Sequence, residues 1–81
     1  MGKLSIGSTK VSLKALFGSR VRLYRERRKM TQLQLAVKVG LQREEISRIE
    51  RGLFGPRFES IEDLAQELQV PVWKLFYFEV P

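Results

Sequence analysis

Residues 30–52 read MTQLQLAVKVGLQREEISRIERG, and this stretch decides the fold. Thr31 occupies the position of a helix N-cap, and Gln32 to Val39 are all compatible with a short helix. Gly40 is expected to end that helix, because glycine adopts a left-handed backbone conformation without a steric penalty. The first part of the stretch therefore predicts a helix of about two turns followed by a sharp turn.

The second part of the stretch predicts another short helix. Leu41 fills the turn, and Gln42 caps a helix that runs from about Arg43 to Arg51. Gly52 ends this helix in the way that Gly40 ends the one before it. Two short helices joined by a turn of about three residues make a helix-turn-helix.

Helical spacing continues on both sides of this motif. Upstream, apolar residues recur every three or four positions and predict a first helix from Leu13 to about Arg28. Gly18 costs about 1 kcal/mol inside that helix, so it indicates either close packing or a break. The stripe of this helix consists of Leu13, Leu16, Phe17, Val21 and Tyr24.

Downstream, a loop over residues 52–57 precedes a fourth helix whose apolar stripe is Phe58, Ile61, Leu64, Ala65 and Leu68. Pro71 suits the first turn of a fifth short helix that carries Val72, Trp73, Leu75 and Phe76. The pattern predicts an all-α fold of five helices. We expect residues 1–12 to form a flexible N-terminal arm and residues 13–81 to form one domain with an apolar C-terminal tail.

Composition narrows the classes of function. The chain has 81 residues and a formal charge of +6, which favours a polyanionic partner such as nucleic acid, although basic residues can simply solvate helix faces. It contains no Cys and no His, so no cofactor or metal is expected. A Gly-rich phosphate loop is also missing, which argues against an enzyme. No segment is apolar enough for a membrane span or a secretory signal, so we expect a cytoplasmic protein.

The helix-turn-helix has an inner and an outer side. Ala36, Gly40, Ile46 and Ile49 occupy its small and buried positions. The opposite face of the second helix of the motif presents polar side chains whose types can bond to base edges in the major groove, namely Gln42, Arg43, Glu44, Ser47 and Arg48.

These residues resemble the Cro and phage-repressor type of helix-turn-helix, the XRE family. The resemblance rests on TQxxLA at 31–36, Gly40 and IxxIExG at 46–52, and it extends over about residues 13–76. It implies a λ-repressor-like fold of five helices, with the helix-turn-helix formed by the second and third.

The resemblance also implies roles in DNA binding. Arg43, Glu44 and Arg48 match positions that contact bases. Gln42 and Ser47 are expected to contact the edge of the groove or a phosphate. We call these five residues the reading face. Both arginines can instead bind phosphate without readout, and Glu44 can be a solvated acid. The residues expected to contact the DNA backbone are Gln32, which can instead be merely solvated, and Arg51 and Arg57, which flank the loop after the recognition helix.

Two further roles follow from the resemblance. Arg25 is expected to pair with Glu50 and to tie the first helix to the third, so Glu50 is not a DNA contact. Family members commonly dimerise through the C-terminal end, where exposed apolar surface is expected at Trp73, Phe76, Tyr77 and Phe78.

The sequence thus predicts a dimeric transcriptional regulator, most simply a repressor, on a palindromic double-stranded operator, without a small-molecule ligand. Two alternatives stay open. One is an antitoxin-like protein-interaction module with secondary DNA binding, and the other is a restriction-modification controller.

Overall fold

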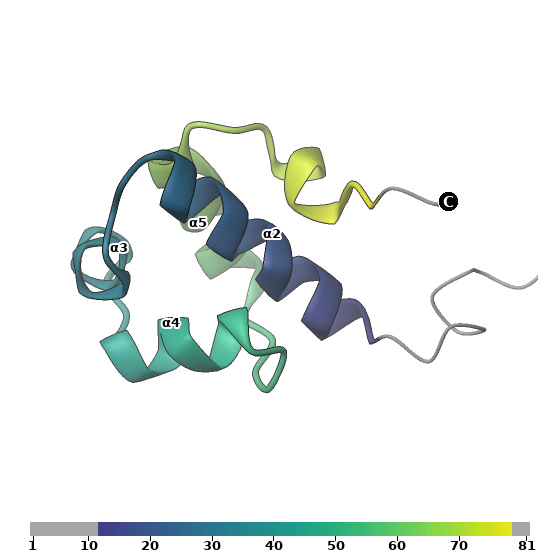
Figure 1. Cartoon of the computed structure of the whole chain (residues 1–81), viewed down its shortest axis with the longest axis horizontal. Coiled ribbons are helices and arrows are strands. Elements are labelled where there is room, and N and C mark those ends of the chain that lie inside the picture. The colour runs from purple at the N-terminus through teal and green to yellow at the C-terminus, as the bar shows by residue number, and fades with distance from the viewer. Residues whose placement is uncertain (1–11, 79–81) are drawn as a thin grey trace, which may run out of the picture.

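A computed structural model describes residues 12–78, and in these residues the fold is all-α (Figure 1). The elements are α2 (Leu13–Arg27), α3 (Gln32–Val39), α4 (Arg43–Glu50), α5 (Phe58–Leu68) and the 3-10 helix η1 (Val72–Phe76). The expected arm lies almost wholly in residues 1–11, and these, like residues 79–81 of the tail, are outside the described residues. None of the described helices is long and apolar enough to cross a membrane.

Local capping explains where α3 and α4 begin and end. The Thr31 hydroxyl accepts from the Gln34 N–H at 3.0 Å, and the Gln34 side chain accepts from the Thr31 N–H at 2.8 Å. Gly40 takes the left-handed conformation with φ 71°, and the Leu41 N–H then bonds to the Ala36 carbonyl at 2.9 Å. The predicted turn is therefore present.

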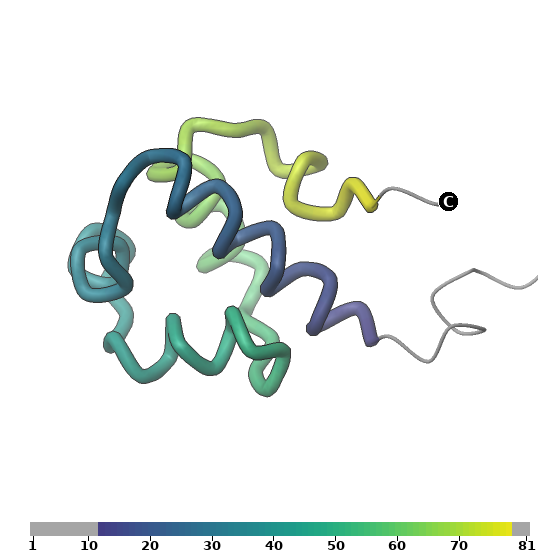
Figure 2. Tube along the Cα trace, viewed as in Figure 1, coloured from purple at the N-terminus to yellow at the C-terminus, as the bar shows by residue number. Residues whose placement is uncertain are grey.

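The helices pack around one core, with α2 running diagonally across the molecule (Figure 1). Helix α4 packs on α2 and α3, and α3 also contacts α5. The 3-10 helix η1 packs on α2 and α5. The trace in Figure 2 shows that the first and last described residues lie at the same end of the molecule, away from α3. The helix-turn-helix core residues Ala36, Ile46 and Ile49 are buried, and Gly40 supplies the turn.

The backbones of α2 and α4 approach each other closely at Gly18. A Cβ atom added at Gly18 would lie 3.0 Å from the Ile49 carbonyl carbon and 3.1 Å from the Glu50 carbonyl carbon, and it would overlap the Ile49 carbonyl oxygen. Gly18 lies inside the continuous helix α2. Of the two readings of this glycine, close packing is therefore correct, and a helix break is wrong.

The structure corrects several expectations from the sequence. The fifth helix is a single 3-10 segment and not an α-helix, and α2 and α4 each end one residue earlier than predicted. Phe58 does not belong to the buried stripe of α5, because it is the first residue of that helix and is 84% exposed. Leu13, at the start of α2, is also about half exposed.

Replacing Gly18 by alanine separates steric packing from helix propensity. Alanine favours a helix by about 1 kcal/mol over glycine, yet here its methyl group would collide with the backbone of α4. We expect Gly18→Ala to lower the free energy of unfolding by about 2–3 kcal/mol in urea denaturation. Gly40→Ala is the matched control, because no atom lies near its added Cβ and only the backbone conformation opposes it, at about 1–2 kcal/mol. A Gly18→Ala protein as stable as the wild type would contradict this account of the crossing.

Candidate nucleic-acid interface

The outward face of α4 carries exposed polar side chains on a rigidly packed helix. Ile46 and Ile49 are fully buried, which fixes the opposite face of this eight-residue helix toward solvent. Arg43, Glu44 and Arg48 are exposed on it. Among residues 12–78 the Arg48 guanidinium makes no hydrogen bond, so its donors are available to an external acceptor.

Gln42 and Ser47, the remaining members of the predicted reading face, lie at different depths. Gln42 is the exposed N-cap residue of α4, and its N–H donates to the Glu45 carboxylate at 2.8 Å. Ser47 is only half-buried, one turn into the helix. The five predicted reading residues therefore stand on or beside one face of α4.

A bidentate ion pair ties α4 to α2. The Arg25 Nε donates to Glu50 Oε2 at 2.6 Å and its Nη2 donates to Glu50 Oε1 at 2.9 Å, while Nη1 donates to the Met30 carbonyl at 2.8 Å. The side chain of Arg25 is 11% exposed and that of Glu50 is 3% exposed. The geometry agrees with the predicted pairing, and Glu50 faces the protein.

This pair also keeps the guanidinium charged. The hydrogen bond to Glu50, with the attraction of the Glu50 and Glu26 carboxylates, outweighs the effect of burial and raises the pKa of Arg25 above its ordinary value. A raised pKa means that the stabilisation from the charged arginine is lost only as pH rises through that value. Arg25 is therefore a permanent cation at any pH at which DNA binding would be assayed.

Gln32 connects the ion pair to the reading face, a link that the sequence did not predict. Its Nε2 donates to Glu50 Oε1 at 3.0 Å, and its Oε1 accepts from Arg43 Nη1 at 3.2 Å. Arg43 Nη2 also approaches Glu44 Oε2 at 3.5 Å. Because the amide bonds at both ends, Gln32 is not merely solvated, and its second Nε2–H is still available to a phosphate.

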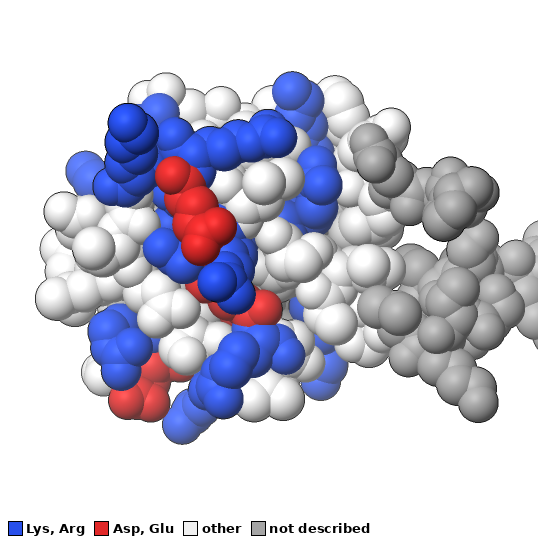
Figure 3. All heavy atoms as spheres, viewed as in Figure 1, with Lys and Arg blue, Asp and Glu red and all other residues white. Residues whose placement is uncertain are grey.

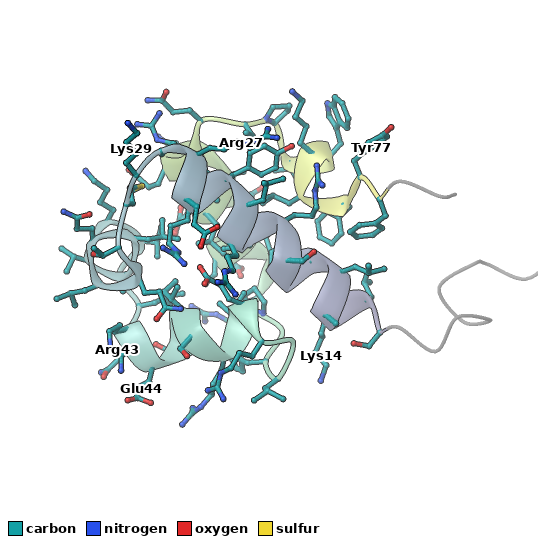
Figure 4. The ribbon with its side chains drawn as sticks, viewed as in Figure 1. Lys14, Arg27, Lys29, Arg43, Glu44 and Tyr77 are labelled. Carbon is teal, nitrogen blue, oxygen red and sulfur yellow. The ribbon has the colours of Figure 1, made fainter. Side chains whose placement is uncertain are left out.

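The other predicted phosphate contacts lie near the C-terminal end of α4 and beyond it. Arg51 is exposed, and its Nε donates to the Ser47 carbonyl at 3.3 Å. Arg57 is exposed at the N-cap of α5. Basic side chains spread across the face on which α2 and α4 lie, with smaller acidic areas between them (Figure 3). Arg43 and Glu44 stand at one edge of the molecule, and Arg27 and Tyr77 stand at the opposite edge (Figure 4).

At that opposite edge, the structure divides the four residues predicted for a dimer interface. Phe76 stacks on Phe17, with ring centroids 5.1 Å apart, and lines an apolar hollow. Trp73 and Tyr77 are exposed and pack edge to face on one another, and Phe78 is half-buried. Leu13 and Phe58 also line this hollow, and an adjoining hollow shares Phe58 and Phe76 with it and adds Val72, so we treat the two as one apolar hollow. The sequence did not suggest Leu13, Phe58 or Val72 for an interface. The high exposure of Phe58 could not be foreseen, because its spacing matches a buried stripe.

Comparison with known families and proteins gives a consistent result. Residues 21–72 match the helix-turn-helix family HTH_3. The chain is 44% identical over 62 residues to the HTH-type transcriptional repressor RghR of Bacillus subtilis strain 168, which covers 75% of this chain and 46% of the relative. It is 38% identical over 55 residues to the immunity repressor protein of Bacillus phage phi105, covering 68% of this chain and 38% of the relative. The chain thus spans less than half the length of either curated relative.

Solved structures share the fold. The restriction-modification controller protein C.AhdI of Aeromonas hydrophila superposes with a TM-score of 0.75 at 32% identity, over 78% of this chain and 96% of the controller. The hypothetical transcription factor NHTF of Neisseria superposes with a TM-score of 0.77 at 30% identity, over 82% of this chain and 76% of that protein.

Breaking the buried pair should destabilise the fold. Arg25→Ala leaves the Glu50 carboxylate without its guanidinium partner, so we expect the free energy of unfolding to fall by about 3 kcal/mol or more in urea denaturation. The control is Arg22→Ala, which removes an exposed pair with Glu26 and should cost about 0.5 kcal/mol or less. Equal losses in the two variants would show that the Arg25–Glu50 pair does not hold α4 on α2.

Proposed function

Since the chain belongs to the HTH_3 helix-turn-helix family of DNA-binding, non-enzymatic transcriptional regulators, we propose that it is a sequence-specific repressor that binds DNA as a homodimer. The observation that carries the proposal is the outward face of α4, where Arg43, Glu44 and Arg48 are exposed on a helix whose other face is fully buried. An α-helix fits the major groove of B-DNA, and arginine can bond to two acceptors of a guanine.

In this proposal the reading and positioning residues have separate tasks. Arg43, Glu44 and Arg48 contact bases, with Gln42 and Ser47 at the edge of the groove. Gln32, Arg51 and Arg57 bind phosphates, and the charge of +6 strengthens attraction to the duplex without selecting a sequence. Repression is proposed from RghR and the phage immunity repressor, whose names describe that outcome for them.

The homodimer is proposed to form around the apolar hollow. Leu13, Phe58, Val72 and Phe76 expose apolar surface that the small core does not use, and contiguous surface of this kind marks interaction sites. A two-fold dimer would place two copies of α4 in successive major grooves about 34 Å apart, so the operator would be palindromic.

A restriction-modification controller is the second candidate. The chain covers 96% of C.AhdI, whereas it covers less than half of RghR and of the phage repressor. This role uses the same reading face and the same dimer. It differs in the gene beside the operator, so genomic mapping of bound sites separates the two roles.

Selection of bound sites from random duplexes tests the proposed reading face. We expect the wild-type chain to select a palindrome. Because the Arg48 side chain is exposed and makes no hydrogen bond in the described part of the chain, Arg48→Ala should preserve the fold and relax preference at one base pair per half-site by about 1–3 kcal/mol. Arg51→Ala, the matched control, should weaken all sites alike and reduce the salt dependence by about one phosphate contact.

Two results of this selection would count against the proposal. A wild-type chain without preference for any duplex would refute sequence-specific binding. Identical selected sites and affinities for Arg48→Ala and Arg51→Ala would refute the division between reading and positioning residues.

A polar substitution in the hollow tests the dimer. Phe58 is exposed in the single chain, so Phe58→Asp should leave folding unchanged while placing a carboxylate in the apolar interface. We expect the dimer dissociation constant, measured by sedimentation equilibrium, to rise at least about a hundredfold. Leu53→Asp is the control, because Leu53 is also exposed but does not line the hollow. A dimer that tolerates Phe58→Asp does not use this face.

A further inference from the structure

Cations and aromatic rings pack against one another along the edge of the molecule formed by α2 and η1. The Arg27 and Arg20 guanidinium carbons lie 5.6 and 5.3 Å from the centre of the Tyr24 ring, and Arg20 also lies 6.0 Å from the Tyr77 ring. Tyr77 packs against Trp73, and the Lys74 ammonium lies 5.8 Å from the Trp73 ring. We call this set the cation–aromatic row, which runs in the order Arg27, Tyr24, Arg20, Tyr77, Trp73 and Lys74.

The row has no acidic partner within residues 12–78. None of its three cations forms a salt bridge there, and the carboxylate nearest in sequence, Glu26, pairs with Arg22 and Arg25. Arg20 donates from Nη2 to the Tyr24 hydroxyl at 3.0 Å, but its buried Nε has no hydrogen-bond partner. These cations are held in place by rings, so they lose little side-chain freedom when an anion binds.

The same chain carries a complementary surface on α5. Glu59, Glu62, Asp63 and Glu67 follow helical spacing along its outer side, and none forms a salt bridge among the described residues. Glu59 is favoured by the start of the helix, whereas Glu67 lies in the last turn, where a negative charge opposes the helix dipole. We call these four residues the acidic face.

The two arginines of the row on α2 span a length of helix similar to that of the acidic face on α5. Arg20 and Arg27 lie seven residues apart, about 10 Å along α2, and Glu59 and Glu67 lie eight apart, about 12 Å along α5. The hollow proposed for dimerisation is lined by residues of both η1 and α5. Glu62 of the acidic face stands on its wall, and η1 also carries Trp73 and Lys74 of the row. In a two-fold interface, any contact between the row of one copy and the acidic face of the other is made twice.

We propose that the cation–aromatic row of one copy docks on the acidic face of α5 in a second copy, and that the contact occurs twice across the two-fold axis. The inference rests on the proposed homodimer and names the charged pairing that selects this partner. Base stacking is a poorer use of the row, because Arg20, Arg27 and Lys74 already lie over its rings. The row also lies at the edge opposite Arg43 and Glu44, where it does not compete with DNA (Figure 4).

Two complementary charge-reversal variants test the pairing. Arg27→Glu with Lys74→Glu reverses the row, and Asp63→Lys with Glu67→Lys reverses the acidic face. In the absence of DNA and at low salt, each variant alone should raise the dimer dissociation constant at least about tenfold, because like charges then meet at both contacts. An equal mixture should form a heterodimer within about threefold of the wild-type affinity, since both contacts again join opposite charges.

A matched control excludes a general effect of net charge. Lys29→Glu with Lys38→Glu makes the same change in net charge as the row variant, on exposed residues outside both surfaces, and should leave the dissociation constant within about threefold. Wild-type dimerisation should also weaken as salt rises from about 0.05 M to about 0.5 M.

The outcomes separate this inference from the proposed function. A wild-type chain that stays monomeric overturns the dimer and the pairing together. A wild-type dimer that Phe58→Asp disrupts, but whose charge-reversal variants fail to recover affinity on mixing, overturns the pairing alone. Equal weakening by the control variant also overturns the pairing, because net charge would then explain the effect.

Discussion

The position of α4 depends on its crossing with α2, where Gly18 allows the two backbones to touch and Arg25 binds Glu50. An eight-residue helix has little stability of its own in water, so its place and direction come from what it packs against. At Gly18 the absence of a side chain brings the helices close, and one turn of α4 is then held by two short charge-assisted hydrogen bonds. Packing on α2 therefore fixes the direction in which the exposed side chains of α4 point.

The ion pair is also the inner end of a polar chain that reaches the surface. Glu50 accepts from Arg25 and from Gln32, and Gln32 accepts from Arg43. Because Glu50 can only accept, it turns the amide of Gln32 so that the carbonyl oxygen faces Arg43. Through Gln32, the buried Glu50 carboxylate therefore favours a side chain that donates hydrogen bonds, here Arg43, at the start of α4.

Much of this architecture was predictable from the sequence, because it depends on local chemistry. Thr31 and Gly40 mark the bounds of α3 through capping and a left-handed turn, and both behave as predicted. What could not be predicted depends on tertiary geometry. Phe58 has the spacing of a core residue, yet its place at the first position of α5 leaves it exposed, and the link from Gln32 to Glu50 joins residues 18 positions apart. Lys29 and Gln69 adopt the left-handed backbone conformation although neither is glycine, so the residue type at these positions does not predict a turn.

The two arginines of the proposed reading face are prepared for DNA in different ways. Arg43 is already hydrogen-bonded to Gln32 and approaches Glu44, so part of its side-chain entropy is lost before any duplex arrives. The Arg48 guanidinium makes no hydrogen bond within residues 12–78, so the side chain must lose its conformational freedom on binding. In the proposed complex, Arg43 therefore favours one geometry at its base pair, whereas Arg48 can adjust to its acceptor. We therefore expect stricter discrimination between bases at the base pair that Arg43 contacts, where the polar chain from the buried ion pair ends, than at the base pair that Arg48 contacts.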